Sequence, residues 1–191
     1  KMGSRHIDTS IMYKNEKDVG QAIKDSGIPR SDIFITAKLP PHIKNQKSAR
    51  RFFERSLSNL RVQYIDAYII NAPGPFNDLD GNYDEGNVEV YKELESLYRE
   101  GLVRAIGVSQ FKIHHLKNIL KHCDMSPQIN QISFFIGHTQ DEIVNFCHKH
   151  NIFIQAFSPL AKGYLFENEI IQEVAEKYIK EPYQIALRYN I

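Results

Sequence analysis

Apolar residues along the chain follow two alternating patterns. Short runs rich in β-branched and aromatic residues are each followed by a longer segment in which apolar positions recur every three or four residues. The short runs occupy residues 5–10, 32–39, 64–70, 102–109, 128–135 and 152–160. This alternation predicts six strand–helix units forming a parallel sheet covered by helices, in a single domain over residues 1–191.

The segments between these runs carry helix signals. Residues 15–27 place apolar side chains on one face and end in Gly27, a residue suited to a helix stop. Ser48 and Thr139 are expected as N-caps of two later helices. Further helices are predicted over residues 48–62, 86–101, 112–123 and 139–151.

Polar residues at the strand ends decide between two ways of arranging such a sheet. A doubly wound sheet usually carries a glycine-rich turn, but the sequence contains neither GxGxxG nor GxxxxGK[ST]. A barrel instead collects its polar chemistry at the C-terminal ends of many strands. Such residues occur at or just past the predicted ends: Asp8, Lys38, Asn71, Ser109, Gln110, Gln131 and Ser158. The pattern therefore favours a (β/α)8 TIM barrel, of which about six units are visible.

Composition narrows the class of protein. The chain has 191 residues, with Lys+Arg 24 against Asp+Glu 23 and a net charge of +1. This balance gives no reason to expect nucleic acid or an anionic membrane as a partner, and no apolar run is long enough to span a bilayer. The two cysteines, Cys123 and Cys147, are far apart and suggest neither a disulfide framework nor a zinc site. We expect a cytoplasmic protein.

One string of residues is specific enough to indicate a family. The stretch SRHIDTSIMYKNEKDVGQAI, residues 4–23, is followed in order by FITAKL, LVRAIGVSQF, INQI and FSPLAKG. Together these motifs resemble the aldo-keto reductase family over nearly the whole chain. The resemblance implies an eight-stranded (β/α) barrel that transfers hydride between a nicotinamide cofactor, usually NADPH, and an aldehyde, ketone or dicarbonyl. NADH is not excluded as the cofactor.

Three residues match the chemistry that this reaction needs. Carbonyl reduction places negative charge on oxygen, so a group must donate a proton or a strong hydrogen bond there. A phenol is a weak acid at neutral pH unless a nearby cation stabilises its phenolate form. By the resemblance, Tyr13 is the proton donor, Lys38 increases its acidity, and Asp8 pairs with Lys38.

The resemblance also assigns a cofactor site. Ser109, Gln110 and Gln131 would bind the nicotinamide carboxamide, which requires both donors and acceptors. Phe157 would stack on the nicotinamide ring. Ser158 and Leu160 would approach the pyrophosphate.

Three positions depart from the family pattern. Asn71 stands where the family usually has histidine, and asparagine donates a hydrogen bond but carries no titrating proton. We expect Asn71 to orient the substrate while Tyr13 transfers the proton. Gln110 replaces the usual asparagine, and Phe157 replaces the usual tyrosine.

Alternatives remain open at this point. His6 and Asp8, two residues apart on one strand, are typical of a metal pair in hydrolytic barrels, but the later strand ends carry Ser109, Gln131 and Ser158 instead of further ligands, so no metal is expected. A non-catalytic nucleotide-binding or scaffold protein on the same fold is the second hypothesis, and Asn71 supports it.

Substrate choice and assembly depend on segments that the sequence describes less well. The irregular segment 71–87 offers Phe76 and Tyr83 as apolar walls for a substrate. Because a complete barrel domain has about 250 residues, we expect the chain to be partial at both ends. An intact barrel would be a monomer, whereas open sheet edges would favour association.

Overall fold

The computed structural model describes residues 3–79 and 81–191. Its contacts divide the chain into two compact units, residues 1–130 and residues 131–191. Each unit is described by itself.

The first unit contains four parallel strands whose order in the sheet follows their order in the sequence. β1 (His6–Asp8), β2 (Phe34–Leu39), β3 (Ile65–Ile70) and β4 (Val103–Ser109) pair successively, with Asp8 opposite Thr36 and Lys38 opposite Ile69. β5 (Ile129–Ser133) begins at the end of this unit. This parallel arrangement confirms the strands predicted there.

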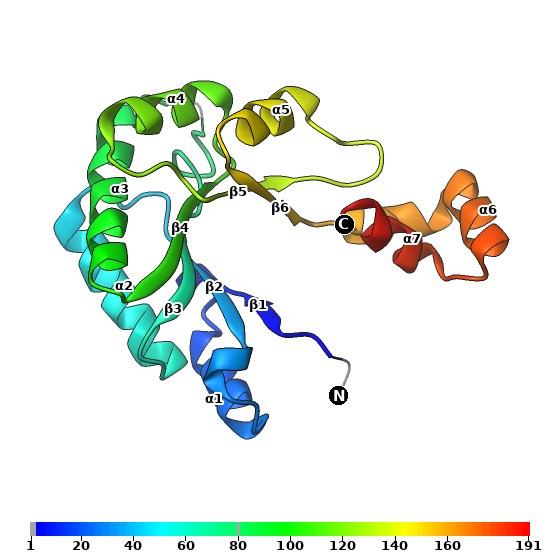
Figure 1. The fold of residues 1–191 in the computed structure, drawn as a ribbon, viewed down its shortest axis with the longest axis horizontal. Coiled ribbons are helices and arrows are strands. Elements are labelled where there is room, and N and C mark those ends of the chain that lie inside the picture. The colour runs from blue at the N-terminus through cyan, green and yellow to red at the C-terminus, as the bar shows by residue number, and fades with distance from the viewer. Residues whose placement is uncertain (1–2, 80) are drawn as a thin grey trace. The chain divides into compact units, whose positions relative to one another are not determined.

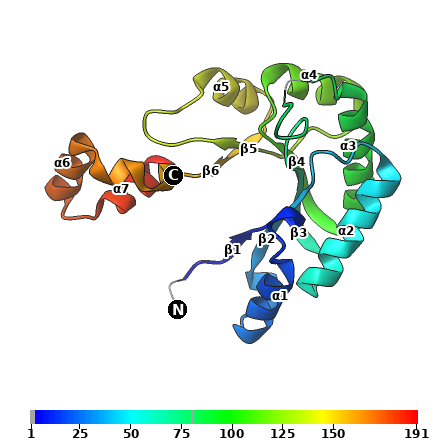
Figure 2. The same ribbon diagram turned by 180° about the vertical axis from the view of Figure 1, so that it is seen from behind.

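Four helices lie along one face of these strands (Figures 1 and 2). They are α1 (Glu16–Asp25), α2 (Gln46–Leu60), α3 (Asp84–Arg99) and α4 (Ile113–His122). Every residue of β3 is buried, as expected for a strand between two neighbours with helices packed over it. The aromatic rings of Phe53 on α2 and Tyr68 on β3 meet edge to face, with centroids 5.1 Å apart.

The helix starts differ from two sequence predictions. α2 begins earlier than expected, and its N-cap is Asn45, whose side chain accepts a hydrogen bond from the Ser48 backbone N–H. Ser48 therefore lies inside the helix, and the prediction of Ser48 as N-cap was wrong. In the second unit, α5 begins after Gln140, not after Thr139.

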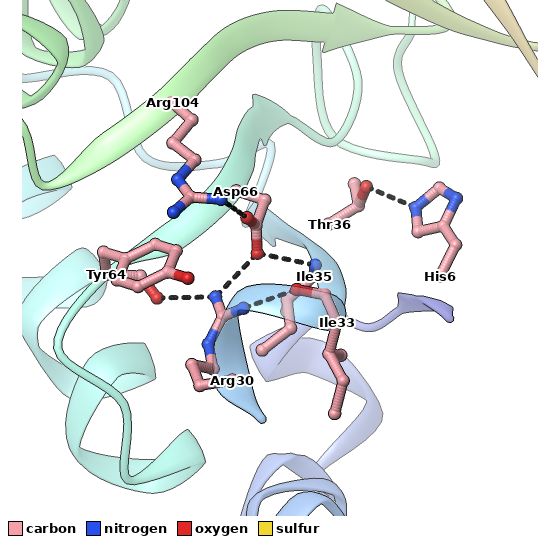
Figure 3. A network of polar contacts seen from close by, with 8 residues as sticks. All are labelled: His6, Arg30, Ile33, Ile35, Thr36, Tyr64, Asp66 and Arg104. Atoms are coloured by element: carbon pink, nitrogen blue, oxygen red, sulfur yellow. Dashed lines mark hydrogen bonds and ion pairs between the residues drawn. The ribbon is translucent and has the colours of Figure 1, made fainter. Parts of the chain in front are cut away.

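A buried carboxylate ties the N-terminal ends of three strands together (Figure 3). Asp66 on β3 accepts hydrogen bonds from Arg30 at 2.6 Å, Arg104 at 3.1 Å and the Ile35 backbone N–H at 2.9 Å. Both guanidinium groups also lie over the Tyr64 ring, 4.1 and 4.3 Å from its centroid. Because its partners come from the β2 and β4 strands and the turn before β2, Asp66 helps to fix the positions of these strands.

The second unit contains β6 (Phe153–Phe157) after β5, together with α5 (Asp141–Lys149), a 3-10 segment η3 (Ala161–Glu167), α6 (Glu169–Tyr178) and α7 (Pro182–Tyr189). Its small core is formed by Leu165, Ile171 and Ala186. The strands and α5 were predicted, whereas α6 and α7 were not. None of the helices that the structure describes combines the length and the apolar character needed to cross a membrane.

Candidate active site

Three residues from β1, β2 and the turn after β1 meet at the C-terminal edge of the first unit's sheet. Asp8 is the last residue of β1, and its carboxylate pairs with the Nζ of Lys38. Lys38 is only 3% exposed, and its Nζ lies 5.3 Å from the centroid of the Tyr13 ring. The structure thus places a buried ammonium between a carboxylate and a phenol.

The local sequence explains why Tyr13 projects into this place. Ser10 caps a 3-10 turn, η1 (Ile11–Tyr13), by accepting a hydrogen bond from the Met12 backbone N–H at 3.2 Å. The turn ends at Lys14, which is left-handed with φ of 57° and whose backbone N–H bonds to Ile11. Tyr13 remains 52% exposed, so part of this residue is accessible to a small molecule.

Asn71 is held near this turn by its backbone and its side chain. It follows β3 directly, and its backbone N–H donates to the Leu39 carbonyl at 3.0 Å. Its side-chain amide donates to the Met12 sulfur at 3.6 Å. Sulfur is a weak acceptor, so the amide can exchange this contact for a stronger one at small cost. The Met12 contact could not be predicted from the sequence, since an apolar residue in a loop carries no signal of its partner.

Ser109 and Gln110, at and just past the end of β4, add polar groups near Asn71. Ser109 is the last residue of β4 and is 1% exposed. Gln110 has a positive φ of 59°, and its side-chain amide donates to the Asn71 carbonyl oxygen at 3.4 Å. Gln110 therefore contacts Asn71, and Asn71 contacts Met12, which directly precedes Tyr13 in the chain.

The other predicted cofactor residues belong to the second unit. Gln131 is buried in the middle of β5, not at its end. Phe157 is the last residue of β6 and is half-buried. Ser158 has a positive φ of 52°, and its carbonyl accepts a hydrogen bond from the backbone N–H of Ala161 in the compact turn that contains Leu160.

The His6 side chain contacts other residues of the first unit. Its Nε2 lies 2.8 Å from the Thr36 hydroxyl, and its ring packs edge-on against Phe34. Burial lowers the pKa of His6, a shift that the nearby Asp8 and Asp66 partly oppose. Within residues 3–79 and 81–191, no group of three or more His, Cys, Asp or Glu side chains is arranged to hold a metal ion.

Comparison with known sequences gives the chain's relationships. The model of the Aldo/keto reductase family matches residues 1–191. Glyoxal reductase of Bacillus subtilis (strain 168) is 39% identical over 191 residues, which are 100% of this chain and 66% of that protein. The chain therefore spans slightly less than two thirds of that relative's length.

Solved structures show the same likeness in three dimensions. The aldo-keto reductase MGS-M4 from a Medee basin deep-sea metagenome library matches with a TM-score of 0.91 at 37% identity, over 98% of this chain and 67% of that one. The aldo-keto reductase of Bombyx mori in complex with NADP matches with a TM-score of 0.86 at 30% identity, over 97% of this chain and 65% of that one. The fold is that of the (β/α)8 aldo-keto reductases, with six of its strands among the residues that the structure describes, and the chain belongs to the aldo/keto reductase family.

Proposed function

We propose that this protein reduces aldehydes, ketones or dicarbonyls to alcohols with NADPH, with Tyr13 as the proton donor. The observation that carries the proposal is the contact chain from Asp8 through the buried Lys38 to the exposed Tyr13 ring. Two relatives support it: one is named glyoxal reductase, and another was solved in complex with NADP.

The residues fit a nicotinamide cofactor and a carbonyl substrate. Bound nicotinamide would supply a hydride to the carbonyl carbon. In the first unit, Ser109 and Gln110 offer a hydroxyl and an amide, the donors and acceptors that a carboxamide requires. In the second unit, we assign Gln131 to the carboxamide, Phe157 to stacking on the nicotinamide, and Ser158 and Leu160 to the pyrophosphate.

Each catalytic residue has a separate task in this proposal. The Tyr13 hydroxyl donates its proton to the carbonyl oxygen as negative charge develops there. Lys38 stabilises the phenolate that remains, and Asp8 holds Lys38 against the ring. Asn71 releases the Met12 sulfur and donates to the substrate oxygen, which orients the substrate without transferring a proton.

The near-neutral charge and the separated cysteines support a cytoplasmic location, and the family fold supports a monomer when the barrel is closed. A non-catalytic nucleotide-binding protein is the competing function, favoured by Asn71 at the position that is usually histidine. The three-residue contact around Lys38 argues against it, because binding alone does not require an acid beside a buried cation.

A two-step assay separates these functions. The purified protein is titrated with NADPH while cofactor fluorescence is recorded, and glyoxal is then added while the absorbance of NADPH is followed. Binding followed by loss of absorbance is the expected result. Binding without any turnover, with glyoxal and with an aromatic aldehyde, would favour the non-catalytic function, and a folded protein that does not bind NADPH would contradict both.

A further inference from the structure

Lys44 is a half-buried cation that the proposed chemistry does not use. It lies between β2 and α2, two residues before the start of the α2 helix. Its Nζ donates to the Pro73 carbonyl oxygen at 2.8 Å and to the Asn87 side-chain oxygen at 2.5 Å. No carboxylate forms an ion pair with Lys44 among the residues that the structure describes, so the ammonium is stabilised by a carbonyl and an amide.

These contacts join both ends of the segment between β3 and α3, of which the structure describes residues 71–79 and 81–83; we call these residues the β3–α3 loop. Pro73 lies two residues after Asn71, and Asn87 belongs to the first turn of α3. The Asn87 amide also donates to the Pro73 carbonyl at 2.9 Å, so this oxygen accepts two hydrogen bonds. Asn87 is 2% exposed, which places the three groups in a shielded environment where such bonds are strong.

The packing around Lys44 is close on two further sides. A Cβ atom at Gly86 would lie 2.7 Å from the Cβ of Lys44, so glycine leaves room for the lysine stem against α3. The Lys44 ammonium also lies 5.2 Å from the centroid of the Tyr83 ring. The Tyr83 hydroxyl in turn donates to Asp78 at 2.7 Å, which extends the connection into the middle of the loop.

We infer that Lys44 is a positioning residue that holds the part of the β3–α3 loop next to Asn71 in one shape and thereby sets which carbonyl compounds the protein accepts. This inference rests on the proposed function, because the loop matters for substrate choice only if Asn71 orients a substrate. The loop presents Phe76, which is 53% exposed, as apolar surface for a bulky substrate. A loop released at Pro73 would no longer present Phe76 and Asn71 together.

The test compares Lys44→Met with Lys44→Arg, which keeps the charge and the donors, and with Lys47→Met, which removes an exposed lysine from the first turn of α2. Amide hydrogen exchange in residues 71–79 is measured on the protein without substrate. We expect exchange to become about tenfold faster or more in Lys44→Met, because two hydrogen bonds to a charged group are lost. Lys44→Arg should restore most of the protection, and Lys47→Met should leave it unchanged.

Steady-state kinetics with glyoxal and benzaldehyde then test the effect on substrate choice. In Lys44→Met we expect the KM for benzaldehyde to rise about tenfold while kcat and NADPH affinity change less than about twofold. Unchanged exchange in residues 71–79 would overturn the role of Lys44 even if the wild-type protein shows no turnover. Faster exchange with an unchanged ratio of kcat/KM for the two substrates would overturn its role in specificity.

Discussion

At the scale of single residues, Lys38 and Lys44 are two lysines whose ammonium groups have different partners and different proposed roles. The Lys38 ammonium forms an ion pair with Asp8 and lies near the Tyr13 ring. The Lys44 ammonium instead donates to the neutral oxygens of Pro73 and Asn87. The place of Lys38 could be predicted because it lies in a strand that alternates regularly and belongs to a recognisable motif. The place of Lys44 could not, because its partners, Pro73 and Asn87, are 29 and 43 residues away in irregular or helical segments.

Burial lowers the pKa of Lys44 to about 8, and this shift predicts a pH dependence of stability. In the unfolded chain the ammonium keeps its proton up to its ordinary pKa of about 10.4. Between pH 8 and pH 10 the unfolded state therefore binds more protons, so the contribution of Lys44 to the free energy of unfolding becomes more favourable as pH rises. The neutral amine still has two N–H donors for Pro73 and Asn87.

Urea unfolding of the wild type and Lys44→Met at pH 7, 8, 9 and 10 checks this sign. The difference in stability between the two proteins should widen in favour of the wild type as pH increases, and the comparison cancels the titration of groups that both proteins share. A difference that narrows over this range would show that Lys44 is held in its charged form.

At the scale of elements, α1 and α2 approach each other through Gly20. A Cβ atom at this position would lie 2.4 Å from the backbone oxygen of Leu60, which cannot move without shifting the end of α2. Gly20→Ala should therefore lower the free energy of unfolding by about 1–3 kcal/mol through overpacking. This loss should exceed the gain of up to about 1 kcal/mol that alanine brings to a helix interior.

Lys17→Ala, at an exposed position on the same helix, is the matched control and should change stability little. Both variants are measured by chemical denaturation at neutral pH. A Gly20→Ala protein as stable as Lys17→Ala would mean that the two helices can separate freely.

Strands could be predicted from the sequence more accurately than the starts of helices. Among the residues that the structure describes, all six predicted strands occur where runs of β-branched and aromatic residues lie. Such runs predict a strand whether it is wholly buried, as β3 is, or partly exposed, as β1 and β6 are. The starts of helices were harder to predict: Ser48 and Asn45 are both good N-caps by residue type, and in the structure Asn45 caps α2. The helices α6 and α7 were not predicted, although both contain apolar residues; the residues they bury are Ile171 and Ala175 in α6 and Ala186 in α7.

At the scale of the whole molecule, the order of the motifs in the sequence indicates the family, and the match over residues 1–191 confirms it. The contacts around Lys38 also agree with the arrangement that the resemblance implied. That residues 1–191 form one domain stays a prediction. The roles of the catalytic residues and of the cofactor-binding residues stay proposals too.

The central claim is that Tyr13 donates the proton, and the Tyr13→Phe variant tests it most directly. Phenylalanine keeps the ring that lies near Lys38 but removes the hydroxyl. With NADPH and glyoxal, we expect kcat to fall about a hundredfold or more, while the affinity for NADPH measured by fluorescence stays within about twofold of the wild type. A Tyr13→Phe protein that reduces glyoxal at nearly the wild-type rate would contradict the account.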